Sequence, residues 1–445
     1  MKITVQSSKL VKPYHGRGIP SIFTNSAIPL TVLDKVTYDE YACLAYFFHP
    51  PATPNSILEM GFIKALAVYR EWAGRLGVDA NGVCSILLND AGARFVTATA
   101  DVALSCINLL QPTPELLSCL CPSDYNTEEL MLVQITQFAC GSFALGVTAH
   151  HTVADGYGMV RFGKAWGKAT RGLAIDPILL VHHRASIFAP RVLPRVEFEH
   201  RGAEFKRREE EVCINQVHPS DKVVAHTAHF NPEMLSELKR RMSAGRPRPY
   251  STFYCITAHL WRCITKVRGL HKDKVTKLII PVNGRLVMRH LPMPMEYTGN
   301  VVLWAQATTT VGELLAKPLR HAVELISREV ARIDDSYFRS FIDFASSGAV
   351  EKESLVPTAS LAKTMDHSTS VFVSNLKGIP VYDLDFGAGR PFFCTRVYHP
   401  QEGFISILPP FASDGSMDVQ VGLFRSAIGI FEEFCYSLLT PNAKL

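Results

Sequence analysis

The sequence predicts an α/β protein of two domains, each a mixed β-sheet covered by helices. The chain has 445 residues, too many for one typical hydrophobic core, and suits two domains of about 200 residues each. Patterns typical of helices and of strands alternate in both halves. Between the halves, the residues from Pro190 to Asp221 are rich in proline and then in charge, with few apolar positions. We therefore expect an N-terminal domain at residues 1–190, a linker at 191–221 and a C-terminal domain at 222–445.

The first half is expected to begin with a strand over residues 1–9. Ser56-Ile-Leu-Glu59 has the form of a capping box and predicts the start of a helix, whose apolar spacing continues to Gly77. The elements predicted after this helix are strands at Met131–Phe138 and Phe143–Ala149, and then a helix that ends at Gly172.

The second half is expected to begin with a strand from Val223 to Phe230. Asn231 followed by Pro232 is a typical helix start, because asparagine caps the first turn and proline fits its first position. The other predicted elements are helices at Ser251–Arg268 and Thr310–Ile333 and strands at Lys277–Val282 and Val301–Ala307.

Composition argues against several classes of protein. Apolar residues make up 47% of the chain and charged residues 20%, as in an ordinary soluble globular enzyme. No apolar run reaches the roughly 18 residues that span a bilayer, and the N-terminus lacks the apolar stretch of a signal peptide. The net charge is a mild +5, and Lys206-Arg207-Arg208 is followed by three glutamates, which indicates a solvated helix face and no nucleic-acid site. Eleven cysteines without a CxxC pair indicate a reduced, cytoplasmic protein with buried thiols.

The segment from Phe143 to Gly156 holds the strongest candidate for a catalytic residue. It places His151 at the end of a predicted strand, with Asp155 four residues later and Gly156 directly after. Imidazole takes a proton near neutral pH, and a residue between a strand and a helix is held rigidly, so His151 is a candidate general base. From these residues alone, a histidine satisfied by local hydrogen bonds and a metal site with His150 stay open. No third metal ligand follows at a sensible spacing, and no HExxH, G-x-S-x-G, P-loop or G-x-G-x-x-G motif occurs, so we expect no metal and no nucleotide cofactor.

A second motif lies at Tyr382–Pro391, which reads YDLDFGAGRP. It closely resembles the D-F-G-W-G signature of the plant BAHD acyltransferases, with Ala388 in the place of the tryptophan. His151–Gly156 matches the H-x-x-x-D-G motif of the same family. Other segments that resemble the family follow in the same order along nearly the whole chain: Ala73–Leu76, Tyr250–Phe253, Ala258–Arg262, Val282–Arg285 and Tyr297–Asn300.

The resemblance implies two similar domains of the chloramphenicol-acetyltransferase type, with the active-site channel between them. Acyl-CoA, a co-substrate and not a bound cofactor, enters from one side, and the acceptor enters from the other. His151 then removes the acceptor proton while the acceptor attacks the thioester directly, without a covalent acyl-enzyme and without a metal. Asp155 is expected to turn away from His151 and pair with Arg285.

The resemblance also suggests roles for other residues. Asp385 is either a second catalytic proton acceptor or part of a sharp turn that closes the CoA side of the channel. The residues expected to support the site are Gly156, Phe386, Gly387 and Gly389. Position alone, and not the resemblance, suggests Ser251 and Thr252 at a helix start as contacts to CoA, and the basic Arg246-Pro-Arg248 as either a contact to its phosphates or a solvated loop. Asn283 and Asn300 are further candidates for contact with CoA or substrate. Plain helix capping explains Ser251 equally well.

Two segments, Met1–Pro13 and Gln137–Gly141, resemble the branch of the family that N-acylates amines. Its acceptors are agmatine, putrescine, tryptamine and tyramine, and its acyl groups are hydroxycinnamoyl or benzoyl. A polyamine acceptor favours an acidic residue near the channel mouth, whereas an arylalkylamine favours aromatic walls. The acidic candidates are Asp34, Glu296 and Asp366. One chain contains all the expected site residues, so a monomer is sufficient.

Three other functions stay open. An O-acyltransferase acting on a shikimate-like or alcohol acceptor would share both motifs, and a channel arginine would favour it. A peptide-synthetase condensation domain uses H-H-x-x-x-D-G, which His150–Gly156 satisfies. The third function is that of a degenerate relative that binds ligands without catalysis. Ala388 and Asn375 suggest it, because the family has tryptophan at the first position and often has tryptophan at the second.

Overall fold

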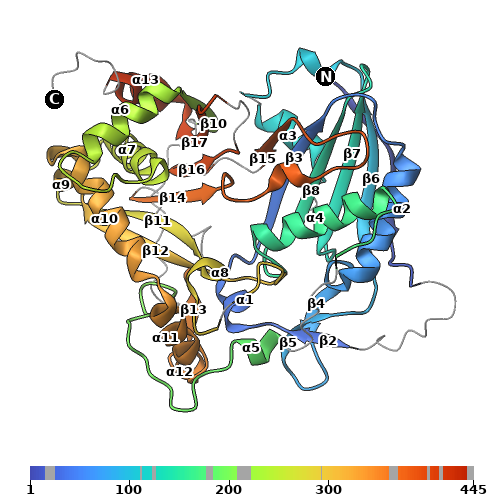
Figure 1. Cartoon of the computed structure of the whole chain (residues 1–445), viewed down its shortest axis with the longest axis horizontal. Coiled ribbons are helices and arrows are strands. Elements are labelled where there is room, and N and C mark those ends of the chain that lie inside the picture. Colours follow the sequence, from blue (N-terminus) through green and yellow to red (C-terminus); the bar gives the residue numbers. More distant parts are fainter. Residues whose placement is uncertain are drawn as a thin grey trace.

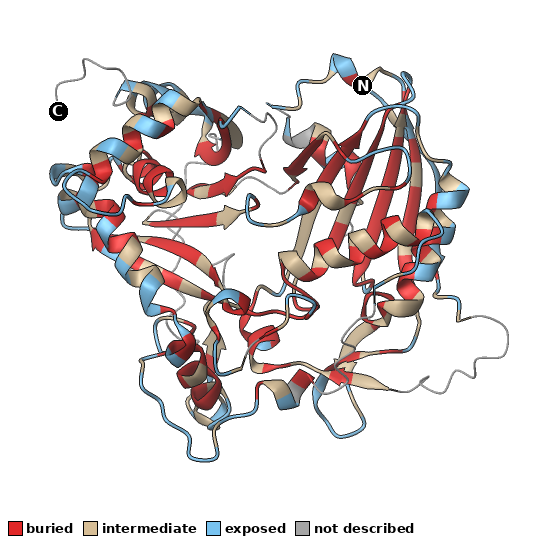
Figure 2. Cartoon of the chain, viewed as in Figure 1, coloured by how far each residue is buried: buried red, intermediate tan, exposed pale blue. Residues whose placement is uncertain are grey.

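The computed structural model contains two six-stranded mixed β-sheets that lie side by side, with helices packed against them (Figure 1). The residues that the structure describes are 1–15, 26–110, 113–122, 127–176, 184–207, 222–291, 293–359, 369–397, 401–409 and 414–437. In these segments, no helix combines the length and the apolar character that crossing a membrane requires. Apart from the exposed edge strand at Ile3–Val11, strands of both sheets are mostly buried or half-buried (Figure 2), as expected where helices cover the faces of a sheet.

The first sheet has the strand order β1-β6-β7-β8-β3-β15, and its β6–β7 pair is parallel. Alternate side chains of β3 point to opposite faces, as the pleat requires. Tyr46 and Phe48 pack with helices α2 and α4, whereas Phe47 packs on the other face with α3. The elements are β1 (Ile3–Val11), β3 (Tyr41–Phe48), α2 (Asn55–Val68), β6 (Ala93–Ala100), α3 (Pro114–Leu120), β7 (Met131–Phe138), β8 (Phe143–His150), α4 (Gly156–Thr170) and β15 (Phe393–Arg396).

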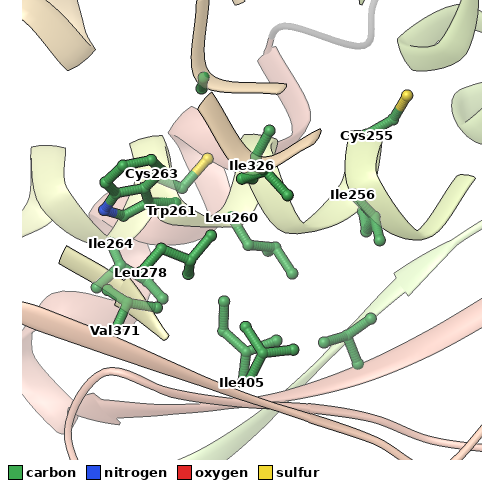
Figure 3. Packing of buried hydrophobic residues seen from close by; sticks show 14 of the residues in the cluster. Cys255, Ile256, Leu260, Trp261, Cys263, Ile264, Leu278, Ile326, Val371 and Ile405 are labelled. Atoms are coloured by element: carbon green, nitrogen blue, oxygen red, sulfur yellow. The ribbon is translucent and has the colours of Figure 1, made fainter. Parts of the chain in front are cut away.

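The second sheet has the order β10-β17-β16-β14-β11-β12, and β14 runs parallel to both of its neighbours. Its outer face is covered by helices (Figure 1). In Figure 3, Leu260 and Ile264 of α7 face Leu278, Val371 and Ile405 of the sheet, and all five are fully buried. The elements are β10 (Val223–Phe230), α6 (Pro232–Met242), α7 (Thr252–Val267), β11 (Val275–Asn283), β12 (Val302–Thr310), α9 (Val311–Ala316), α10 (Leu319–Arg332), β14 (Ser370–Asn375), β16 (Phe404–Ile407), β17 (Met417–Phe424) and α13 (Ile428–Ser437).

Two features join the halves of the chain. Strand β15 comes from the second half but pairs antiparallel with β3 and completes the first sheet. A separate core cluster packs Leu33 and Val36 against Val282, Tyr297 and Phe338 of the second half. The remaining short elements are β2 (Ala27–Pro29), α1 (Val32–Val36), β4 (Arg75–Val78), β5 (Cys84–Leu87), α5 (Arg184–Ile187), β9 (Phe205–Arg207), α8 (Gly284–Val287), α11 (Asp335–Ala345), α12 (Ala349–Lys352) and β13 (Leu355–Pro357).

The prediction of a single helix from Ser56 to Gly77 is wrong at both ends. The helix begins at Asn55, and its cap residue Pro54 makes no side-chain capping bond, so Ser56 is inside the first turn. The helix ends at Val68, because Tyr69 takes a backbone conformation of φ −102° and ψ 64° that is not helical. A short 3₁₀ turn follows, and then strand β4 pairs with β5.

The helix predicted at Thr310–Ile333 is two helices. Thr310 caps α9, and Pro318 separates α9 from α10. Proline lacks the N–H that would continue the helical hydrogen bonds, and it also forces the preceding residue out of the helical region. Accordingly, Lys317 is extended, with ψ at 156°.

The linker at 191–221 stays a prediction, and its residues 208–221 lie outside the described segments. Lys206 and Arg207 belong to strand β9, which pairs with β13, so the predicted helix face is wrong for these two residues.

Other local predictions agree with the structure. Strand β7 has the predicted bounds, β8 extends the prediction by one residue, and Asn231 caps α6.

Candidate active site

A cavity of about 560 Å³ is lined by residues from both sheets. The first half contributes Ala42–Leu44 of β3, His151 in the loop after β8, and Asp155 with the start of α4. The second half contributes Ile279–Asn283 from β11 and Phe372–Asn375 from β14. Most of the lining side chains are apolar, as is usual for a small-molecule site with few polar groups.

The loop that carries His151 is held by hydrogen bonds from both halves of the chain. Strand β8 ends at His150, and the next backbone N–H, that of His151, donates to the carbonyl of Glu40 at 2.9 Å. From the second half, Nδ2 of Asn300 donates to the carbonyl oxygens of His151 and Thr152, each at 3.1 Å. Asn300 therefore contacts the histidine loop, and it is not among the described residues that line the cavity.

The His151 imidazole is neutral at pH 7. Burial and the nearby Arg396 guanidinium lower the pKa of His151 to about 4, because both disfavour the charged ring. Its Nδ1 lies 3.3 Å from Oγ1 of Thr37. Within the described segments, the other ring nitrogen, Nε2, has no hydrogen-bond partner. The site thus offers an uncharged base on the wall of an apolar cavity.

Asp155 is turned away from this imidazole. Its Oδ1 accepts from the N–H of Gly158 at 3.1 Å and so caps α4. Its Oδ2 accepts from Nη1 of Arg285 at 2.5 Å and from the N–H of Val301 at 3.0 Å. Arg285 also donates to two backbone carbonyls of its own half, at 2.8 Å each. The pair therefore links α4 of the first half to the second half directly behind His151.

Gly156 and Asn283 lie beside this ion pair and both line the cavity. A Cβ at Gly156 would stand 2.6 Å from Cδ1 of Ile379, so the end of the Ile379 side chain would have to move. Oδ1 of Asn283 accepts from the N–H of Arg285 at 3.0 Å. Its Nδ2 is buried and has no partner among the described residues.

The structure does not bring Asp385 to His151. Asp385 is absent from the described residues that line the cavity, and it pairs with Arg171 at 3.1 Å. Its Oδ1 accepts from the N–H of Gly387 at 2.8 Å, which closes a tight turn. Gly387 and Gly389 have φ values of 101° and 108°, a backbone region that favours glycine. Phe386 anchors the turn, with its ring 4.9 Å from that of Trp166.

The proposed CoA contacts are only partly at the cavity. Ser251 lines it and also caps α7, since its Oγ accepts from the N–H of Tyr254 at 3.2 Å. Thr252 is not among the described lining residues. The Arg246 guanidinium lies 4.2 Å from the centre of the Tyr250 ring.

Two of the three acidic residues expected near the channel mouth do not line the cavity, and the third is outside the described residues. Asp34 is buried, caps its own helix and accepts from Asn300. Glu296 lies 3.8 Å from Arg161, and neither Asp34 nor Glu296 lines the cavity. Asp366 lies outside the described residues.

Sequence reasoning missed Glu40, which does line the cavity. The signal that could have revealed it is its place just before a strand that pairs with the strand of His151.

The described residues contain one group of three potential metal ligands, His259, Cys263 and Cys435. All three are buried in the core of the second half, and none lines the cavity. His150, which sequence alone left open as a ligand beside His151, lies 3.6 Å from Asp39 instead.

The Transferase family model matches residues 1–438 of this chain. Agmatine coumaroyltransferase-1 of Hordeum vulgare is 54% identical, covering 98% of this chain and 100% of that protein. Agmatine hydroxycinnamoyltransferase 1 of Oryza sativa subsp. japonica is 51% identical, covering 98% and 99%. Among solved structures, vinorine synthase superposes with a TM-score of 0.74 at 19% identity, covering 98% of each chain. The predicted two-sheet α/β fold is therefore confirmed, and the chain belongs to the Transferase family, the BAHD acyltransferases, as an enzyme that transfers acyl groups.

Proposed function

We propose that this enzyme transfers an aromatic acyl group, hydroxycinnamoyl or benzoyl, from acyl-CoA to an amine and so forms an amide. The observation that carries the proposal is the neutral His151, whose Nε2 has no described protein partner, on the wall of an apolar cavity. The acceptor is supported by the names of full-length relatives, two agmatine acyltransferases and putrescine hydroxycinnamoyltransferase 3 of Oryza sativa subsp. japonica, which is 41% identical.

His151 serves in this mechanism as the general base. An ammonium has no lone pair, so the acceptor attacks as the neutral amine, and its nitrogen becomes acidic as the C–N bond forms. His151 Nε2 accepts that proton. The tetrahedral intermediate then collapses, the C–S bond breaks, and the CoA sulfur leaves with the electron pair and takes the proton from the imidazolium. Thr37, 3.3 Å from Nδ1, orients the ring.

The residues around His151 act in this proposal by holding its loop. Asp155, Arg285 and Asn300 link the loop to the second half. Gly156 leaves room for Ile379. The D-F-G-x-G turn, with Asp385, Phe386, Gly387 and Gly389, packs behind α4, and Asp385 has no part in proton transfer. Asn283, which lines the cavity, contacts substrate, and Ser251 lines the path of CoA.

We further propose that the enzyme is a cytoplasmic monomer with the domains 1–190 and 222–445. His151, Asp155 and Arg285 come from one chain, so a second subunit is unnecessary. All ten cysteines that the structure describes carry free thiols, which is typical of proteins from reducing compartments.

One observation favours a second function. Arg396 lines the cavity, and an arginine there suits a carboxylate acceptor such as shikimate, which would give an ester. Both functions share the base and the acyl donor, so only the acceptor distinguishes them.

A thiol-release assay tests both functions. The purified protein is given p-coumaroyl-CoA, feruloyl-CoA or benzoyl-CoA with agmatine, putrescine, tryptamine, tyramine or shikimate, and His151→Ala is the control. Amide formation that disappears in the variant supports the proposal. Turnover of shikimate alone supports the ester-forming function, and no turnover with any pair contradicts both.

A further inference from the structure

A second, smaller cavity of about 30 Å³ adjoins the cavity that contains His151. The two cavities share Ala42, Leu44 and Met159 among their lining residues, so they meet at these three side chains. None of the described residues that line the smaller cavity is charged. We call it the annex, and its walls include Ala42, Leu44, Val147, Ala149, Met159 and Gly163.

The first sheet forms one wall of the annex, and helix α4, which lies across that sheet, forms the other (Figure 1). On the sheet side, Ala42 and Leu44 of β3 pair with Ala149 and Val147 of β8. Ala149 and Val147 come two and four residues before His151. At about 3.3 Å per residue, these two pairs lie about 7 Å and about 13 Å from the base along the strands. The annex therefore extends away from His151 along the first sheet.

Gly163 of α4 lines the annex and is not among the described residues that line the larger cavity. Among the described residues, an added Cβ would meet Cδ1 of Leu384 at 3.7 Å, an ordinary van der Waals distance. At Gly158 and Gly167 of the same helix, a Cβ would instead meet backbone oxygens at 2.3 and 2.5 Å, so close packing requires glycine there. A glycine inside a helix is less favourable than alanine. Close packing does not explain Gly163, and what its missing side chain leaves open is the annex.

The annex has the size and the polarity of a methoxyl group. One water-sized group needs about 10–15 Å³ of such space, so about 30 Å³ holds about two non-hydrogen atoms. A cationic acceptor amine would lose its hydration there and gain no counter-charge from the described lining residues, so its burial is unfavourable. A methoxyl on the aromatic ring of the acyl donor is uncharged. The acyl donor is therefore the substrate whose substituent suits the annex.

A hydroxycinnamoyl group also has the right length. With bonds of about 1.4–1.5 Å, its ring substituents lie about 6–8 Å from the thioester carbonyl, which is attacked beside His151. This reach matches the distance to the pair of Ala42 and Ala149. A benzoyl group lacks the two-carbon link between carbonyl and ring, so it ends about 2.5 Å short. Met159 lies where the two cavities meet, and its flexible side chain can move aside for a substituent.

We propose that the annex binds a methoxyl substituent on the ring of a hydroxycinnamoyl-CoA, and that Gly163 determines this acyl-donor specificity by keeping the annex open. This inference rests on the proposed amide-forming function and adds the class of acyl donor, a ring-methoxylated hydroxycinnamoyl group such as feruloyl.

Gly163→Val tests the inference because its side chain fills the annex without entering the described lining of the larger cavity. In the thiol-release assay with agmatine, the ratio of kcat/KM for feruloyl-CoA to that for p-coumaroyl-CoA should fall at least tenfold, since p-coumaroyl has no methoxyl. The ratio for benzoyl-CoA to p-coumaroyl-CoA should stay within threefold, because benzoyl does not reach the annex.

Two further variants support this test. Gly163→Ala adds one carbon at an ordinary contact distance, so it should unfold at or above the wild-type temperature and lower the feruloyl to p-coumaroyl ratio about threefold. It therefore decides the question even where the valine variant does not fold. Gly429→Val is the matched control: it changes a glycine of helix α13 that has open space around an added Cβ and lines neither cavity. It should leave both ratios within twofold.

Binding without an acceptor gives a second readout. Quenching of tryptophan fluorescence by each CoA ester gives its Kd, and the ratio of the feruloyl-CoA to the p-coumaroyl-CoA value should rise at least tenfold in Gly163→Val. Unchanged ratios in both Gly163 variants, or equal losses for the two donors, would overturn the role of the annex. A raised KM for the acceptor with unchanged donor ratios would also overturn it. Wild-type protein that forms no amide, while Gly163→Val still shifts the Kd ratio, would remove the proposed function and leave the annex as a binding site.

Discussion

Asp155→Ala tests whether the pair of Asp155 and Arg285 acts by holding the loop of His151. The two residues are 3% and 7% exposed, so the change leaves a buried guanidinium and the N–H of Val301 without their acceptor. Loss of one partner of a buried ion pair costs about 3–5 kcal/mol. If a domain of about 200 residues unfolds as one unit, the Tm should fall by roughly 6–20 °C. Activity should fall in parallel, because the loop that positions His151 loosens.

The assay compares thermal unfolding with thiol release for Asp155→Ala, Arg285→Met and the double variant. Removing both charges leaves no unpaired ion, so the double variant should lose less unfolding free energy than the two single variants together, by about 1–3 kcal/mol. Asp155→Ala protein that keeps the wild-type Tm and still loses its activity would refute the reasoning, since Asp155 would then act in the chemistry itself.

The further predictions concern the base, the second motif and the glycines beside the site. Removing the base, as in His151→Ala, should lower kcat by about 10²–10⁴-fold with little change in Tm. Diethylpyrocarbonate reacts with the neutral form of a histidine ring. Inactivation by this reagent should therefore slow only as the pH falls through about 4, where the His151 ring becomes protonated. A midpoint at about 6.5, the ordinary histidine pKa, would contradict the effect of burial on the pKa of His151. The same depressed pKa makes His151 favour the unfolded state in acid, so its contribution to stability is complete above about pH 6.5 and is lost progressively as the pH falls toward 4. Asp385→Asn should lower the free energy of unfolding by about 1 kcal/mol, because it weakens the partly exposed pair with Arg171 and the turn, and it should change kcat less than threefold. A hundredfold loss of kcat at unchanged Tm would restore a catalytic role for Asp385. Gly158→Ala should destabilise more than Gly156→Ala, because the new Cβ meets a backbone oxygen of Thr298 at 2.3 Å instead of the movable end of Ile379 at 2.6 Å; equal Tm values for the two variants would argue against this difference.

Local patterns predicted well what depends on residues a few positions apart. The cap at Asn231 and the strands β7 and β8 follow from side chains within one turn or one pleat of each other. Local patterns failed where a backbone break decides the element. The apolar spacing after Val68 continues, yet Tyr69 leaves the helix and the next residues form a strand against β5. Pro318 could have been read as a helix break from the sequence.

The sequence by itself determined the two-layer α/β elements, the place of His151 at the end of a strand and, through two family motifs, the class of chemistry. Only the tertiary structure decided how that histidine behaves. Its low pKa comes from burial between two halves of the chain and from Arg396, which reaches the first sheet on a strand from the second half. Glu40 enters the cavity only because β3 pairs with β8. The burial of a site residue and the charges around it depend on groups that are far apart in the chain. A pattern of neighbouring residues therefore cannot predict the pKa of that residue.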